Sequence, residues 1–307
     1  MIEHVFGGDW TEDKLRRLRE YLIAYRNIFT NNPRASYFNT WYVDAFAGTG
    51  TRTSPSDSKA LADQSEGLYV DRETASFLDG SAKIALGIPS PFHRYFFIEG
   101  STKKAKALRS TVASEFPQLI DRTEIKTDDA NTALCRWCRD RDWSKERAVV
   151  FLDPYGMQVE WATVQLLGET KGVDLWYLFS LGGVIRMLTR DGLIEESWQR
   201  RLDNVFGATD WREHFYRTAT EPSLFGIHDV THRDATVKNV QKYIEGRLKT
   251  AFVAVAPSLV LRNSRSFPQF ALCFAASNEK GAKPALKIAT HLLRESKEGA
   301  DGDTVFD

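Results

Sequence analysis

A glycine-rich turn follows a short apolar segment that begins near residue 41. Residues 41–47 are rich in aromatic and β-branched side chains, and Gly48 and Gly50 come directly after them. This pattern predicts a buried strand feeding a tight turn, where backbone without a Cβ can approach a ligand closely. The candidate binding residues here are Asp44, Phe46, Ala47, Gly48 and Gly50. Because the GxGxxG pattern stops at Thr53 and no P-loop follows, a nucleoside ligand is favoured over NAD or ATP.

Acidic residues stand at the ends of the next two predicted strands. Glu99 and Gly100 follow residues 95–98, and Asp128 and Asp129 end the segment that starts at Thr123. Glu99 could accept hydrogen bonds from both ribose hydroxyls, as an acid does in dinucleotide folds. Asp128 or Asp129 could accept one from an adenine amino group. Each acid alone reads as a cap or turn residue, but acids at three successive strand ends favour a binding site.

A fourth motif, Asp153-Pro154-Tyr155-Gly156, follows the most apolar segment of the chain, residues 148–152. The Asp153 carboxylate and the Pro154 carbonyl could both accept hydrogen bonds from one NH2 group and expose the nitrogen lone pair. Tyr155 offers a face on which a planar base can stack. These residues predict alkyl transfer from a sulfonium to an amino nitrogen, a reaction that positioning largely drives. The alternative is an ordinary β-turn, which the same residue types favour.

Strands and helices alternate through the first two thirds of the chain, which predicts a parallel sheet covered on both faces. Two further strands near the C-terminus, separated by a short polar loop, predict an antiparallel hairpin. We therefore expect an α/β protein with a mostly parallel, Rossmann-like sheet, whose outline resembles that of a class I methyltransferase sheet. The predicted helices cover 12–29 (with Thr11 as N-cap and Lys14 at the start of the exposed side), 80–86, 101–116, 131–142, 161–168 and 283–297. The predicted strands cover 41–47, 95–100, 123–128, 148–156, 173–180, 250–261 and 267–276.

The same pattern divides the chain into four parts. Residues 1–40 form an N-terminal helical segment, and 41–185 form the nucleoside-binding core. Residues 186–250, rich in Arg, Trp and Asp, are expected to be a helical insertion that faces the substrate. Residues 251–307 complete the core with the hairpin and a last helix.

Taken together, the motifs resemble those of the three-Cys-motif partner family (TcmP). The resemblance covers most of residues 9–295 except 186–250. The matching motifs, in chain order, are Thr11-x-x-Lys14 with Tyr21, Asp44-x-Phe-Ala-Gly, Gly80-Ser-Ala, Leu152-Asp-Pro-Tyr-Gly and Phe274-Ala-Ala-Ser-Asn. The three cysteines in the family's name belong to a partner protein with a radical-type cysteine motif. The first and fourth motifs also look like those of amino-group methyltransferases.

The resemblance implies S-adenosylmethionine as cofactor and methyl transfer to an amino nitrogen, most plausibly of a nucleic-acid base. Base amino methyltransferases usually carry two prolines before the aromatic residue, whereas this chain has Pro154 alone. Two other functions stay open. The chain could be a non-catalytic partner subunit of a cysteine-motif protein that keeps the methyltransferase fold. A nicotinamide oxidoreductase is less compatible, because the glycine fingerprint is incomplete.

The composition and charge of the chain limit the classes of partner that it is expected to bind. The 41 basic and 41 acidic residues give a formal charge of zero, which disfavours binding of nucleic acid by bulk charge. Local basic patches remain: Arg186, Arg190, Arg200 and Arg201 beside Trp198, Arg262 with Arg265, and a lysine run (Lys103, Lys104, Lys106) that we interpret as a solvated helix face. Three cysteines, and His228 with His232, lack metal-site patterns, so no metal is expected. With no signal peptide or membrane span visible, we expect a cytoplasmic protein.

Overall fold

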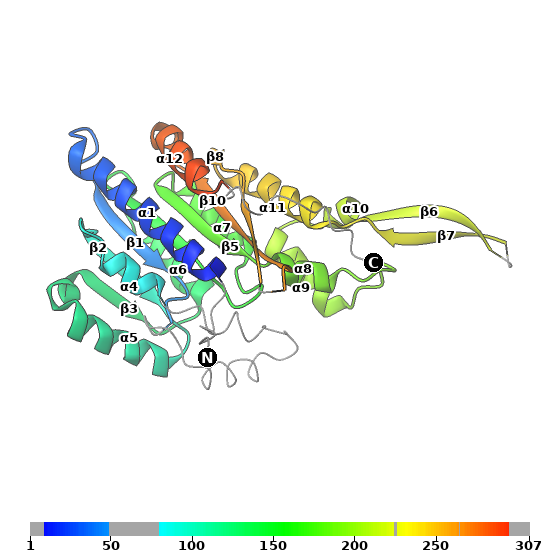
Figure 1. Ribbon diagram of the computed structural model, residues 1–307, viewed down its shortest axis with the longest axis horizontal. Coiled ribbons are helices and arrows are strands. Elements are labelled where there is room, and N and C mark those ends of the chain that lie inside the picture. The colour runs from blue at the N-terminus through cyan, green and yellow to red at the C-terminus, as the bar shows by residue number, and fades with distance from the viewer. Residues whose placement is uncertain (1–8, 49–79, 224–225, 264, 295–307) are drawn as a thin grey trace, which may run out of the picture.

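The structure, a computed structural model of the chain, describes residues 9–48, 80–223, 226–263 and 265–294. Its centre is an eight-stranded sheet with the order β3-β2-β1-β4-β5-β10-β8, in which β9 also pairs with β10 (Figure 1). The strands of this sheet are β1 (Asn39–Asp44), β2 (Arg94–Ile98), β3 (Thr123–Lys126), β4 (Glu146–Leu152), β5 (Val173–Phe179), β8 (Ala254–Val255), β9 (Leu259–Arg262) and β10 (Pro268–Ala276).

Strands β1 to β5 pair in parallel, and β10 runs antiparallel to β5, β8 and β9. The order 3-2-1-4-5 matches the first five strands of the Rossmann-type order 3-2-1-4-5-6, in which the ligand crevice lies where the strand order reverses, between β1 and β4. The α/β class, the mostly parallel sheet and the antiparallel C-terminal hairpin are therefore confirmed.

Two layers of helices cover the two faces of the sheet. The first layer contains α1 (Asp9–Asn31), α4 (Ser81–Leu86), α5 (Thr102–Glu115) and α12 (Glu279–Leu292), with the 3-10 helix η1 (Pro117–Arg122) beside α5. The second layer contains α6 (Ala130–Arg139), α7 (Trp161–Glu169), α8 (Leu181–Met187) and α11 (Val237–Ala251). Each layer contributes to its own hydrophobic core, so the sheet is buried on both sides.

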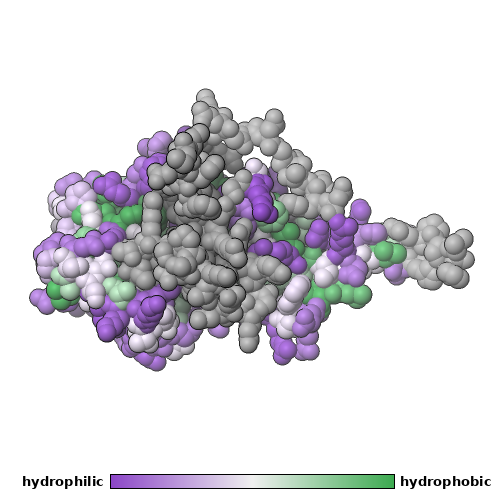
Figure 2. Space-filling model, turned by 60° about the horizontal axis from the view of Figure 1, so that its bottom comes forward, coloured by the Kyte–Doolittle hydropathy of each residue, from purple (hydrophilic) through white to green (hydrophobic). Residues whose placement is uncertain are grey.

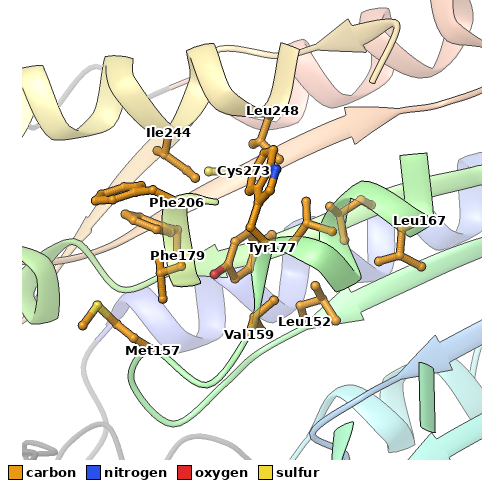
Figure 3. Packing of buried hydrophobic residues seen from close by; sticks show 14 of the residues in the cluster. Leu152, Met157, Val159, Leu167, Tyr177, Phe179, Phe206, Ile244, Leu248 and Cys273 are labelled. Atoms are coloured by element: carbon orange, nitrogen blue, oxygen red, sulfur yellow. The ribbon is translucent and has the colours of Figure 1, made fainter. Parts of the chain in front are cut away.

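Alternation along the central strands sends successive side chains into these two cores. Val43 and Val150 face the α6–α7–α11 layer, whereas Tyr42 and Phe151 face the α1–α4–α12 layer, and all four are fully buried. Figure 3 shows the core on the α6–α7–α11 side of the sheet, near α11, with Tyr177 of β5 among the side chains of the cluster. This two-sided burial explains why β4 reads as a continuous apolar run rather than an alternating one.

The segment 186–250 contains more than helices. It has α9 (Glu196–Phe206) and α10 (Trp211–Phe215), as expected, but 216–233 forms a two-stranded antiparallel hairpin of β6 (Tyr216–Ser223) and β7 (Gly226–Arg233). The hairpin extends away from the sheet at one end of the molecule (Figure 1). In the view of Figure 2, hydrophilic residues make up most of the described surface, and hydrophobic surface near the hairpin is confined to small areas.

Several boundaries differ from the sequence-based expectation, and three of the differences change the architecture. Helix α1 begins at Asp9, so Thr11 lies inside its first turn instead of capping it. Helix α11 continues to Ala251 and packs on the core, which places 237–251 against the sheet rather than in an overhanging insertion. The strand expected over 250–261 is divided into β8 and β9.

The contact between α7 and α11 gives a stability prediction. A Cβ on Gly168 of α7 would lie 2.2 Å from the carbonyl oxygen of Ala251, whereas a Cβ on Gly246 of α11 would meet nothing within 4 Å. Gly168→Ala should therefore lower the free energy of unfolding by about 1–3 kcal/mol, because the backbone must move. Gly246→Ala, the matched control in an exposed helix interior, should raise it by about 0.5–1 kcal/mol. Urea unfolding measures both, and equal effects would contradict the packing.

Candidate functional site

The carboxyl ends of the parallel strands meet along one edge of the sheet, and three buried carboxylates lie there. Asp44 is the last residue of β1, while Glu99 and Asp153 directly follow β2 and β4. Because β2, β1 and β4 are neighbours, the three residues share one edge. This is the edge at which open α/β sheets bind ligands.

A pocket of about 380 Å³ opens at this edge. Its lining comes from four strand ends: Ala45, Phe46, Glu99, Gly100, Asp128, Asp129, Ala130, Asn131, Tyr155, Gln158 and Glu160. The predicted site residues that it brings together are Phe46, Glu99, Gly100, Asp128, Asp129 and Tyr155. Those outside its lining are Asp44, Ala47, Gly48, Asp153, Pro154 and Gly156. Gly50 lies outside the described residues.

Glu99 connects the glycine turn to the second strand end. Its Oε2 accepts a hydrogen bond from the backbone N–H of Gly48 at 2.9 Å, and its Oε1 accepts one from Ser101 N–H at 2.8 Å. Gly48 has a φ of 60°, a left-handed conformation that favours glycine. A carboxylate offers about four lone-pair positions, so each oxygen of Glu99 can accept a further hydrogen bond from a ligand hydroxyl.

Asp44 lies behind the pocket and holds the turn in place. Its carboxylate accepts hydrogen bonds from Ser81 Oγ at 2.5 Å, from the N–H of Phe46 at 3.1 Å and from the Tyr42 hydroxyl at 3.3 Å. Burial, with a smaller effect from the nearby charge of Asp153, raises the pKa of Asp44 to about 7 against the lowering effect of those hydrogen bonds. The residue therefore positions Phe46, which lines the pocket, rather than facing the pocket itself.

The acids after β3 combine a structural and a binding position. Asp129 is the N-cap of α6, and its Oδ1 accepts a hydrogen bond from Thr132 N–H at 2.8 Å. Asp128 accepts one from the N–H of Asp129 at 2.9 Å and lies 3.6 Å from a guanidinium nitrogen of Arg136. Both residues nevertheless line the pocket, so capping leaves them available to a ligand.

The motif after β4 is split between a buried and a pocket-facing part. Asp153 and Pro154 are buried, Gly156 turns the chain with a φ of 77°, and Tyr155 reaches the pocket lining. Lys104 of α5 donates a hydrogen bond to the Tyr155 hydroxyl at 2.7 Å and lies 4.8 Å from its ring centre. The interpretation of Lys104 as a solvated residue is therefore wrong: it is half-buried and fixes Tyr155 beside the pocket.

A buried ion pair joins this motif to the N-terminal helix. Lys14 Nζ lies 2.5 Å from Asp153 Oδ2, and the two side chains are 1% and 2% exposed. The Lys14 ammonium also lies 5.8 Å from the centre of the Phe151 ring. The expectation that Lys14 lies on the exposed side of its helix is therefore wrong: the structure buries it at the strand end that was expected to bind an amine.

Two more polar contacts fasten α1 along the sheet. Tyr21 donates a hydrogen bond to Asp174 Oδ2 at 2.6 Å, and Arg26 donates one to Thr40 Oγ1 at 2.6 Å. Burial raises the pKa of Asp174 to about 7, against the lowering effect of the Tyr21 hydrogen bond. Together with Lys14, these contacts hold α1 from the pocket edge to the opposite end of the strands.

Asn131 lines the pocket as well, although sequence analysis did not select it. Its Oδ1 accepts hydrogen bonds from Glu160 N–H at 3.0 Å and from Thr163 Oγ1 at 2.9 Å, and its Nδ2 donates to the carbonyl of Gln158 at 2.9 Å. It therefore ties the loop after β4 to the start of α6. No local sequence pattern marks such a long-range contact.

The described part of the chain contains neither a candidate metal site nor a candidate membrane-spanning helix. No cluster of three or more His, Cys, Asp or Glu side chains there could hold a metal ion. No helix among those residues combines the length and the apolar character that crossing a membrane needs. Cys135 is half-buried and Cys138 is buried, with burial raising the pKa of the Cys138 thiol to about 12.

Comparisons with known proteins give weak similarities. No protein-family model and no curated protein matches the chain. A spermidine synthase from Thermotoga maritima is 10% identical, with a TM-score of 0.34, over 83% of this chain and 60% of its own. A Listeria monocytogenes protein, provisionally described as an S-adenosylmethionine-dependent methyltransferase, is 10% identical, with a TM-score of 0.35, over 83% and 99%. A Legionella pneumophila protein matching the DUF519 family model is 12% identical, with a TM-score of 0.35, over 78% and 93%.

Scores and identities this low carry no argument about activity. The assignment of the fold rests on the strand order of the sheet, and the candidate site rests on the pocket at its edge.

The Lys14–Asp153 pair gives the first prediction at the site. Lys14→Met should lower the free energy of unfolding by about 3–5 kcal/mol, because it takes the ammonium away from a buried carboxylate. The double change Lys14→Met with Asp153→Leu should recover most of this loss. Arg16→Met, at an exposed ion pair with Glu20 on the same helix, should cost less than about 1 kcal/mol. Urea unfolding tests this, and additive losses at Lys14 and Asp153 would contradict coupling.

The raised carboxyl pKa values predict a pH dependence of stability. The pKa values of Asp44 and Asp174 are about 7 in the folded protein, whereas the pKa of an aspartate in the unfolded chain is 3.8. The folded state therefore binds more protons across this window, and the free energy of unfolding should fall as the pH rises, levelling off above about pH 7. Asp174→Asn, which keeps an acceptor for Tyr21, should make that fall shallower in urea unfolding. An unchanged slope would contradict the assignment.

Proposed function

We propose that this chain is an S-adenosylmethionine-dependent methyltransferase and that the pocket at the strand ends is its cofactor site. The observation that carries the proposal is the convergence of Glu99, Asp128, Asp129 and Tyr155, from three different strand ends, on one pocket of about 380 Å³. That volume lies in the ordinary range of small-molecule sites. The resemblance of the Asp44 and Asp153 motifs to those of amino-group methyltransferases supports the same reading.

The chemistry of the lining fits the nucleoside part of the cofactor. Carboxylates are acceptors only, and a ribose with an adenine amino group offers the donors that they need. Glu99 would hold the ribose hydroxyls, since each of its oxygens already accepts one backbone N–H and keeps room for another donor. Asp128 or Asp129 would hold the adenine amino group. The bound cofactor supplies an electrophilic methyl group, and the turn after Asp44 would border it.

The acceptor is proposed to be an amino nitrogen, most plausibly of a nucleic-acid base that is unpaired or flipped. Tyr155 would stack on that base, with Lys104 fixing its hydroxyl. The Asp153 carboxylate would orient the amine together with the Pro154 carbonyl. Because Lys14 holds Asp153 at 2.5 Å, an amine reaches this carboxylate only if it shares Asp153 with Lys14 or displaces it.

That ion pair also favours a second candidate function. A non-catalytic partner subunit of a cysteine-motif protein would keep the fold and the nucleoside pocket while its Asp153 serves as an anchor for α1. The two candidate functions differ in whether the chain transfers methyl groups by itself.

Purified chain incubated with labelled S-adenosylmethionine and separate DNA, RNA and protein acceptors should transfer label to one of these classes of acceptor. Binding without any transfer, gained only when a cysteine-motif protein is added, would support the accessory role.

The cofactor site is tested by calorimetry with S-adenosylhomocysteine. Wild-type protein should bind it, and Glu99→Ala should weaken binding at least about tenfold, which corresponds to about 1.4 kcal/mol. Glu124→Ala, at an exposed carboxylate on β3 outside the pocket, is the matched control and should bind like wild type. No binding by the wild-type protein, or equal binding by Glu99→Ala, would overturn the assignment.

A further inference from the structure

A second pocket of about 430 Å³ lies directly beside the proposed cofactor site. Its lining comes from the whole length of α6 with its two cap residues and from the N-terminal end of α7: Asp129, Asn131, Thr132, Cys135, Arg136, Arg139, Asp140, Glu160, Ala162 and Thr163. Asp129, Asn131 and Glu160 line both pockets. The two spaces therefore adjoin at these three residues.

The boundary between the two pockets is held rigidly. Asn131 is fixed by its hydrogen bonds to the Glu160 N–H and to Thr163, and Asp129 is fixed by capping α6. The side chains of Asn131 and Asp129 are thus held in place between the pockets. Asp129 and Glu160 are exposed, so this boundary lies at the protein surface, and a ligand group that passes over Asp129 reaches the second pocket.

We propose that the second pocket is a subsite for a substituent on the adenine amino group, so that the site takes adenosyl ligands enlarged at that nitrogen. The inference rests on the proposed function, which directs the adenine amino group to Asp128 or Asp129. A singly substituted amino group keeps one N–H, which is enough to donate to a carboxylate. Its other position then carries the substituent past Asp129.

The lining indicates what kind of substituent fits. The positive charges of Arg136 and Arg139 are offset by the negative charges of Asp129, Asp140 and Glu160. A strongly charged substituent therefore gains no net electrostatic attraction from this lining. The methyl group of Ala162, the Cys135 thiol and the planar guanidinium groups favour a neutral aromatic group, because guanidinium planes stack on aromatic rings. A benzyl group matches this chemistry.

The probe is S-adenosylhomocysteine that carries a benzyl group on its adenine amino nitrogen, compared with S-adenosylhomocysteine itself by calorimetry. The benzylated ligand should bind within about tenfold of the parent, a difference of at most about 1.4 kcal/mol. Binding more than about tenfold weaker, with the parent still bound, overturns the subsite and leaves the proposed function intact. Absence of binding by the parent overturns the proposed function instead.

Two variants locate the substituent. Ala162 lines the second pocket but not the first, so Ala162→Trp fills the second pocket from α7 and should weaken the benzylated ligand more than about tenfold while sparing the parent. Gln165→Trp adds the same side chain at an exposed position of α7 outside both pockets and should bind both ligands like wild type. Equal binding of the benzylated ligand to Ala162→Trp and wild type would overturn the location.

Cys135 gives a readout that needs no variant. Iodoacetamide alkylates an accessible thiol: a sulfur–carbon bond forms, iodide leaves and the thiol proton passes to solvent. Cys138 and Cys273 are 3% and 1% exposed, so alkylation of the folded protein should fall on Cys135. The benzylated ligand should slow this reaction, followed by mass spectrometry, more than the parent ligand does. Equal rates under saturation by either ligand would count against a benzyl group in the second pocket.

Discussion

The site depends on one buried electrostatic contact, between the Lys14 ammonium and the Asp153 carboxylate. Either group alone would be costly to remove from water, so each is tolerated at this depth because the other is there. The contact carries α1 up to the end of β4 and brings positive charge to an edge where Asp44 and Glu99 also lie. Without that charge, three carboxylates would crowd a region of low solvent access.

The remaining residues of the edge serve the fold and the pocket at once. Asp129 caps a helix, Glu99 accepts two backbone N–H groups, and Tyr155 is held by Lys104, yet all three line the same pocket. A cap or a turn and a ligand contact are therefore compatible roles for one carboxylate, because its oxygens accept several hydrogen bonds. Asp44 differs: its carboxylate is enclosed by Ser81, Tyr42 and the backbone, and it acts on the pocket through the turn that it holds.

Sequence periodicity predicted the parallel sheet and its helices because those signals are local and strong. The apolar run in β4 and the three–four spacing in α1 are examples. The β6–β7 hairpin escaped prediction because its strands carry charged and polar residues on both faces, so no alternation marks them. They are held by cross-strand contacts such as the Thr220–Asp229 hydrogen bond, which a linear pattern does not reveal.

The same distinction separates the predicted from the unpredicted site residues. Glu99, Asp128 and Tyr155 lie one, two and three residues after the ends of β2, β3 and β4, so strand prediction placed them at the edge. Lys104 and Asn131 come from helices, and their roles depend on side chains reaching segments 51 and 27 to 32 residues away in the sequence. Lys14 contacts Asp153, which lies 139 residues away in the sequence, and the family motif that contains Lys14 assigned it no role.

The β6–β7 hairpin determines where the folded protein unfolds locally. Both of its strands are edges, and a two-stranded ribbon is marginally stable by itself in water. Its base is secured by the Tyr216 hydroxyl on the Thr189 carbonyl and by Arg233 on the Leu188 carbonyl. The ribbon therefore behaves as a separate cooperative unit, whose amides exchange with solvent through local fraying while the eight-stranded sheet stays intact.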